Sequence, residues 1–269
     1  MPVSNVIIVD QAVSTSQSGI AYSALGYDTI VPVSTPVGTD EDASYPFINV
    51  YDYRDNTKYS PVTTSGTVTI VLSQSVATSI DYFAFAIHNA TEAGMSGFFE
   101  VDDGTGYTLV SEFSTIPNDK PFMATFDAVT SSRQRITFVF TAKFFLGSIN
   151  VGKSIVFGGT PSLGFQPGAL ASLDTVEQST TDGGNFLIGR RNNRGFQTKA
   201  TFNFVEFSFI DTFWEDYQNH VLDSKPVYFK WASTRAESSY GLQPPKSLTR
   251  PTYATSFHST LSFEFRGYA

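Results

Sequence analysis

Hydrophobic and polar residues alternate along much of this chain, with the period of two that is typical of half-buried β-strands. Residues 81–88 differ, because they are almost all apolar, as expected for a central strand covered on both faces. Short strands separated by turns at this spacing predict an all-β sandwich or jelly roll. The alternating segments are residues 67–72, 135–141, 149–151, 154–157, 200–209 and 256–266.

Other segments complete this all-β pattern. Residues 97–102 and 107–110 flank a Gly-containing stretch, which predicts a β-hairpin. Residues 29–33 contain a proline and predict a short edge strand. Further strands are predicted at residues 3–9, 186–188 and 227–231.

One helix is predicted, at residues 211–224. Its apolar and aromatic residues, among them Phe213, Trp214 and Tyr217, recur at helical spacing. Asp211 or Thr212 is suited to cap its first turn, because side-chain oxygens there accept free backbone N–H groups. The helix is expected to end before Pro226.

Charge and turn residues predict a division into two domains. Residues 1–157 carry 7 Lys/Arg and 15 Asp/Glu, a net charge of −8, whereas residues 158–269 carry 10 of each and are neutral. Glycine and proline cluster just beyond residue 157. We therefore predict a β-sandwich over residues 1–157 and a second β domain, with the helix, over residues 158–269. Strand 3–9 is a candidate for either domain.

The composition narrows the possible functions. The chain of 269 residues has no cysteine, so disulfides and thiolate chemistry are excluded. It has no apolar run of 18 residues and no signal-peptide pattern at its start, so we expect a soluble protein made in the cytoplasm, with no membrane insertion. The acidic first part argues against specific nucleic-acid binding, which needs a basic face.

No catalytic, cofactor-binding or metal-binding residue is predicted, and we expect the protein not to be an enzyme. His88, His220 and His258 lie on three separate predicted elements, without the spacing of metal ligands. No nucleophile elbow and no phosphate-binding loop occurs. Two acidic runs, at residues 40–42 and 102–103, are compatible with calcium binding or with a solvated loop and a hairpin turn.

Three arginines form the most concentrated positive charge. Arg190, Arg191 and Arg194 lie within a stretch of five residues in a predicted turn, residues 189–195. Arginine is favoured at protein interfaces and binds carboxylates in a fork. The three residues are candidates for contacts between subunits, and a solvated hairpin tip is the equally open alternative.

Two stretches of the chain resemble parts of bacteriophage tail proteins. In the first, an aromatic-rich strand ends in His88-Asn89 and precedes a strand–Asp-Gly–strand hairpin with Tyr107. This order resembles the discoidin-like, or galactose-binding-like, β-sandwich of such proteins. The second stretch, from residue 149 onward, combines a long strand, the helix with its aromatic face and strand 226–231. It is similar to the tail-tube-like domain of distal tail and minor tail proteins.

The resemblance implies a virion structural protein at the distal end of a phage tail, assembled in the host cytoplasm. Its partners would be copies of itself in a ring, as a hexamer in distal tail proteins, and neighbouring tail-tube and tail-tip or hub proteins. The discoidin-like module would lie outside the ring and contact host-surface carbohydrate, although no set of sugar-binding residues matches. Two other functions stay open: a carbohydrate-binding adhesin without an assembly role, and a glycan-degrading enzyme.

Overall fold

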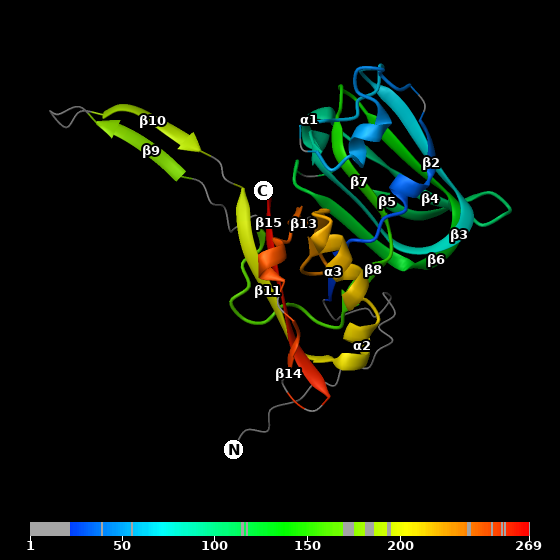
Figure 1. Cartoon of the computed structure of the whole chain (residues 1–269). Helices are drawn as coiled ribbons and strands as arrows, with labels where there is room; N and C mark the ends of the chain where they lie inside the picture. Colours follow the sequence, from blue (N-terminus) through cyan, green and yellow to red (C-terminus); the bar gives the residue numbers. More distant parts are fainter. Residues whose placement is uncertain are drawn as a thin grey trace.

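The chain folds into two large β-sheets with few helices, so the predicted all-β class is confirmed (Figure 1). Strand 3–9 lies outside the residues that the structure describes. This computed structural model describes residues 22–38, 40–54, 56–113, 116, 118–168, 175–180, 186–192, 195–235, 238–248, 250–253, 255 and 257–268.

The first sheet forms a β-sandwich by folding over on itself. Two long strands, β3 and β6, pair along most of their length, and the register shifts near the middle. Residues 75–77 of β3 are exposed at this corner, while residues on both sides of it face one core. The strand order is β2-β3-β6-β4-β5, with β7 paired to β3. The strands are β2 (Thr35–Gly38), β3 (Gly66–His88), β4 (Ser96–Asp102), β5 (Tyr107–Phe113), β6 (Phe122–Phe140) and β7 (Leu146–Gly152).

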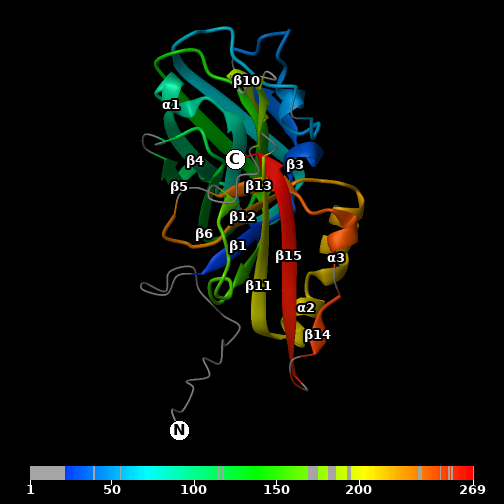
Figure 2. The ribbon, with the colours of Figure 1, turned by 90° about the vertical axis from the view of Figure 1, so that its left-hand side faces the viewer.

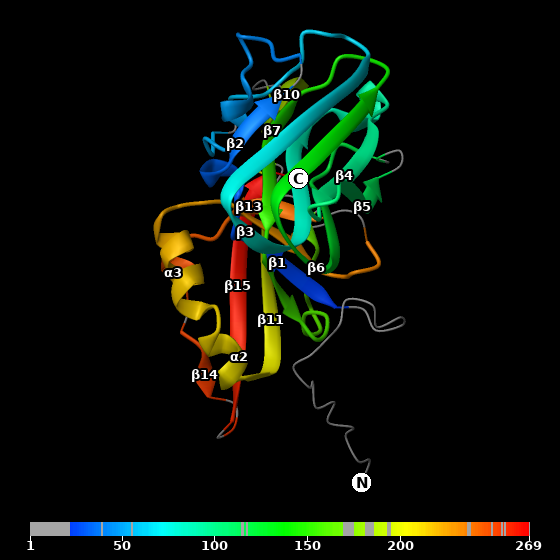
Figure 3. The same cartoon turned by 90° about the vertical axis from the view of Figure 1, so that its right-hand side faces the viewer.

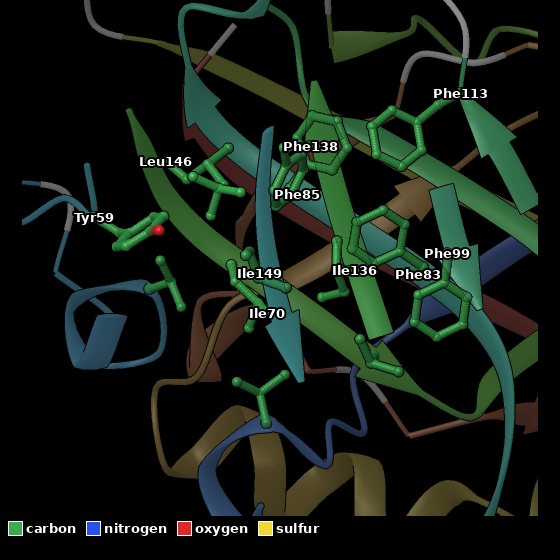
Figure 4. Close-up of a cluster of buried hydrophobic side chains, with 14 of the residues drawn as sticks. Tyr59, Ile70, Phe83, Phe85, Phe99, Phe113, Ile136, Phe138, Leu146 and Ile149 are labelled. Carbon is green, nitrogen blue, oxygen red and sulfur yellow. The ribbon is translucent and has the colours of Figure 1, made fainter. Parts of the chain in front are cut away.

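Aromatic rings fill the sandwich core (Figure 4). Phe83 lies parallel to Phe99 at 5.2 Å between ring centroids, and Phe85 contacts Phe138 edge-on at 6.2 Å. Residues 82–86 are all buried, as predicted for a strand covered on both faces. Phe83 and Phe85 point into the sandwich, whereas Tyr82 and its alternate neighbours face the second sheet.

The second sheet has the strand order β11-β15-β13-β12-β1-β8, with β14 paired to β15. Helices α2 and α3 lie beside β11 and β15 (Figures 2 and 3), and Phe213, Tyr217 and Val221 join the core of this sheet. The strands are β1 (Ser23–Gly26), β8 (Ser154–Phe157), β11 (Phe196–Glu206), β12 (Val227–Lys230), β13 (Ser239–Leu242), β14 (Thr252–Tyr253) and β15 (His258–Tyr268).

The two sheets divide the chain differently from the predicted domains. Strand β8, which the prediction placed in the sandwich, pairs with β1 in the second sheet. Strand β1 in turn pairs with β12, so the described part of the chain begins in the second sheet, enters the sandwich and returns after Gly152. Residues 29–33 were predicted as a strand, but Val31–Val33 form a 3-10 helix. Other short helices in the described parts of the chain are Phe47–Val50, Ala90–Ala93 (α1) and Pro245–Ser247.

The predicted helix is present but interrupted. α2 (Phe207–Asp211) and α3 (Trp214–Leu222) are separated by Thr212 and Phe213. Neither Asp211 nor Thr212 caps α3: its N-cap is Phe213, without a side-chain hydrogen bond, and the Thr212 hydroxyl donates to the Phe209 carbonyl at 2.6 Å. Strand β11 therefore ends at Glu206, three residues earlier than predicted.

Candidate assembly surfaces

A β-hairpin separate from both sheets carries two of the three predicted contact arginines. Strands β9 (Thr175–Thr180) and β10 (Phe186–Asn192) pair only with each other among the described strands (Figure 1). Arg190 lies opposite Glu177 and Arg191 opposite Val176. Both arginines were predicted on a turn, but they belong to a strand; their side chains and Arg194 lie outside the described residues.

Strands β11 and β15 form a long two-stranded ribbon beyond the rest of the second sheet. They pair from Phe196 opposite Gly267 to Glu206 opposite His258. One face is apolar and belongs to the core, whereas the other carries polar cross-strand pairs. The Gln197 amide donates to Glu264 at 2.9 Å, and the hydroxyls of Thr201 and Ser262 lie 3.0 Å apart. This face is held in place by its own hydrogen bonds.

The free edge of β11 is partly covered by the segment that follows β8. The Ser162 N–H donates to the Thr201 carbonyl at 2.8 Å, and the Asn203 amide donates to the Ser162 hydroxyl at 2.9 Å. An uncovered edge strand offers unpaired backbone groups to other chains. The loop therefore limits edge pairing to the parts of β11 outside this contact.

Phe204 lies in a β-bulge at the far end of the ribbon. Its φ of 59° is rare for an aromatic residue, and its side chain is 62% exposed. The exposed Phe257 lies in the segment just before β15, and the ring of His258 contacts Phe204 edge-on. Bulges turn side chains away from their regular direction, and here the result is an aromatic group that faces solvent.

The acidic runs are used by the fold itself. Asp40 accepts the Thr63 N–H at 2.7 Å, and Glu41 accepts the Phe47 N–H at 3.1 Å. In the hairpin turn, hydrogen bonds from Thr105 are the main cause that lowers the pKa of Asp103. In the parts of the chain that the structure describes, no group of three or more His, Cys, Asp or Glu residues is placed to hold a metal ion.

The three histidines do not share a site. The ring of His88 donates from Nε2 to the Lys120 carbonyl and accepts the Ala90 N–H at Nδ1. His220 bonds the Pro226 carbonyl, and His258 bonds Thr255. Burial lowers the pKa of His88 and of His220, so both rings are neutral at pH 7.

Sequence reasoning missed two arrangements that depend on the tertiary fold. On the outer face of the sandwich, Arg135 makes two hydrogen bonds of 2.7 Å to Glu100 and lies 4.1 Å from the ring centre of Tyr107. Between the two sheets, the ammonium of Lys230 donates to the Met123 carbonyl at 3.0 Å. Each joins residues far apart in the sequence, and neither leaves a local pattern.

None of the described helices is both long enough and apolar enough to cross a lipid bilayer. No protein-family model and no curated protein sequence matches the chain.

Among solved structures, part of the chain is similar to carbohydrate-binding modules. A CBM32 module from Clostridium perfringens in complex with GalNAc-β-1,3-galactose aligns at 14% identity, over 46% of this chain and 99% of that one, with a TM-score of 0.40. A chitosan-binding module of a chitosanase/glucanase from Paenibacillus sp. IK-5 aligns at 18% identity over 46% and 98%, with a TM-score of 0.39. A pectin-binding module aligns at 16% identity over 44% and 89%, with a TM-score of 0.37. These names describe what those modules bind, and nothing about the ligand of this chain follows from them.

Proposed function

We propose that this chain is a structural, non-catalytic subunit that assembles with copies of itself into a ring at the distal end of a bacteriophage tail. In this proposal the second sheet and hairpin β9–β10 form the ring, and the sandwich lies outside it. Neighbouring tail-tube and tail-tip proteins would contact the ring in the virion. The resemblance of residues 65–267 to tail proteins is the reason for proposing a bacteriophage tail as the assembly.

The observation that supports assembly best is the unpartnered hairpin. An isolated two-stranded hairpin is marginally stable in water, because it buries too little apolar surface to offset its ordering. Strands β9 and β10 have no third strand among the described residues. A neighbouring copy that packs against the hairpin would supply the missing contacts, and Arg190 and Arg191 would there be available to carboxylates of that copy.

The ribbon of β11 and β15 fits the same role. Its core-facing side is closed, and its other side is polar and internally hydrogen-bonded. A polar, fixed face is suited to line a wet central opening. Hairpin and ribbon follow each other in the chain, so a head-to-tail contact between copies can close a ring.

Deleting the hairpin tests the assembly. Residues 175–192 would be replaced by a short Gly-Ser linker, and the full chain and the variant compared by analytical ultracentrifugation and electron microscopy. We expect rings from the full chain and folded monomers from the variant. A control variant with the single substitution Asp103→Asn, in the β4–β5 turn, should still form rings. A full chain that stays monomeric at high concentration, and also within the virion, would sink the proposal.

Contact between the sandwich and host glycans is the second part of the proposal. Tyr45 is an exposed aromatic residue in a loop of the sandwich, with the Lys143 ammonium 5.9 Å from its ring centre. Sugar rings pack their C–H faces on such rings, whose flat surface is apolar while their edge stays wet. On a glycan array, we expect Tyr45→Ala to lose binding and the nearby Ile48→Ala to retain it. Glycan binding by a chain that never forms rings would instead support an adhesin.

A further inference from the structure

The contact between the two sheets, here called the seam, covers a free strand edge. The first half of β6 pairs with β3 on one side, and no described strand pairs with it on the other. Groups of the second sheet occupy that side at every second residue. Ser238 N–H donates to the Pro121 carbonyl at 2.7 Å, Lys230 donates to the Met123 carbonyl, and the hydroxyl of Tyr22 lies 2.9 Å from that of Thr125.

The seam buries much less apolar surface than either core. Three of its seven buried hydrophobic members are alanines. The sandwich core and the core of the second sheet are instead rich in phenylalanine. Because hydrophobic stabilisation grows with the apolar area removed from water, the seam is the weakest of the three packed regions.

The chain crosses between the sheets beside β7, which lies on the other edge of β3 from β6. Residues 27–30 and Lys153 make the two crossings next to β7, where Ile30 N–H bonds the Val151 carbonyl at 2.8 Å. At this point a side chain at Gly152 would collide with the Asp28 carbonyl. Tyr82 also donates to that carbonyl at 2.6 Å. The tightly fitted crossings are placed to act as a hinge about which the seam opens.

Lys230 is an unusual residue for such a buried contact. Its side chain is 6% exposed and donates to one carbonyl, Met123, and no carboxylate pairs with it among the described ion pairs. A buried ammonium without a counter-charge is costly, and it regains hydration when the contact opens. An apolar side chain of similar length would hold the seam more firmly.

We propose that the seam is a separable contact between the sandwich and the second sheet, and that buried Lys230 sets how often it opens. In its closed state the sandwich has one fixed orientation; in its open state it turns about the crossings near Gly152. Opening of the seam involves one chain only and does not depend on ring formation.

The charge of Lys230 makes the opening of the seam depend on pH. Burial, with no charged neighbour contributing, lowers the pKa of Lys230 to about 8. Among the described residues, the titratable side chains of the seam and of the elements beside it include Tyr22, Tyr82, Tyr228, Tyr240 and, on β6, Asp127. In the open state the ammonium is hydrated and recovers its ordinary pKa. Protonation therefore favours the open state, and opening becomes rarer as the pH rises through 8.

Single cysteines make opening measurable, because the chain contains none of its own. Ala84 and Ala24 are fully buried in the seam, whereas Ala93 and Ala200 are fully buried in the two cores. Each would be replaced by cysteine, and its reaction with a thiol reagent would be measured and normalised to the reaction of a free thiol at the same pH. We expect the two seam positions to react about tenfold faster than the two core positions, because local opening costs less than global unfolding.

Lys230→Met in the A84C and A24C backgrounds tests the role of the lysine. We expect it to slow both seam reactions about tenfold at pH 7, while the exposed Lys199→Met leaves them unchanged. With Lys230 present, the normalised seam rate should fall about tenfold between pH 6 and pH 9; with methionine it should stay constant. Seam cysteines that react no faster than core cysteines, or a seam rate that Lys230→Met leaves unaltered, would overturn the proposal.

Discussion

The sandwich and the second sheet solve the same problem, burial of apolar faces, in different ways. The sandwich folds one sheet over on itself, so that β3 and β6 supply both walls of its core. The second sheet stays open: helices α2 and α3 cover one side, and the β11–β15 ribbon and hairpin β9–β10 extend away from it. A closed sandwich is complete in itself, whereas an open sheet with projecting strands is suited to contacts with other chains.

The polar side chains of the sandwich and those of the second sheet also differ in their hydrogen-bond partners. In the sandwich, carboxylates are used locally: Asp40 and Glu41 accept backbone N–H groups, and Glu100 binds Arg135. In the second sheet, the polar groups of the ribbon form cross-strand pairs on an outward face. In the proposed function, the second sheet therefore makes the contacts between copies and the sandwich is the part that is presented.

The largest expected effect is a loss of stability in the sandwich core alone. Phe83→Ala removes a fully buried ring that stacks on Phe99, and should lower the free energy of unfolding by about 3–5 kcal/mol. Because the seam is weak, thermal unfolding should then show two transitions, with the sandwich unfolding first. Phe98→Ala, which removes an exposed ring on the outer face of β4, should cost less than about 1 kcal/mol. A single, uniformly lowered transition for Phe83→Ala would mean that the two parts unfold as one unit.

A smaller effect comes from pH. The folded pKa of Lys230 is about 8, below its unfolded value of 10.5. The unfolded chain therefore binds more protons between these values, and the free energy of unfolding rises with pH there. From pH 7 to pH 10 the gain is about 2 kcal/mol. Above pH 10 the trend reverses, since burial raises the pKa of Tyr82, Tyr217 and Tyr228 well above their ordinary value of 10.

Denaturant unfolding between pH 7 and pH 11 measures both limbs of this curve. Lys230→Met should remove the rise and keep the fall above pH 10. A rise that persists in the variant would place its origin outside the seam.

The smallest expected effect concerns the bulge in the ribbon. Phe204 has a φ of 59°, a conformation that asparagine adopts at lower cost. Phe204→Asn should therefore raise the free energy of unfolding of the monomer by about 0.5–1 kcal/mol, although it removes a large apolar side chain. Val205→Asn, next to it, should be neutral or destabilising. Loss of stability in Phe204→Asn would show that the exposed ring makes contacts that outweigh its strain.

The period-two pattern of the chain predicted most of the strands. Alternation placed residues 67–72 and the closing strand, an apolar run placed residues 81–88, and the Gly-containing turn placed the hairpin around Gly104. Residues 67–72 and 81–88, predicted as two strands, belong to one long strand, β3. The pattern joined β11 to α2 wrongly, because apolar residues again alternate with polar ones from Val205 to Phe209, after a change of phase at Phe204, and this stretch runs into the helix. The alternation of residue types carries no direct information about a backbone φ such as the 59° of Phe204.

The candidate site was predictable only in part. Arg190 and Arg191 stand out by charge in any reading of the chain, but their place on a separate hairpin depends on which strands find partners. Nothing in the neighbourhood of Lys230 marks it as buried, since a strand of four residues that ends in lysine usually leaves the ammonium in water.

By itself, the sequence determined that the protein is all-β, that it lacks cysteine chemistry and that its charge is concentrated in one part. These properties are set by residue types and by spacing over a few positions. Only the tertiary structure decided that β1 and β8 pair with each other in the second sheet, and that Lys230 meets the free edge of β6. The reason is physical: pairing between distant strands is chosen by which edges and faces remain unsatisfied after local structure has formed, and that depends on the whole chain at once.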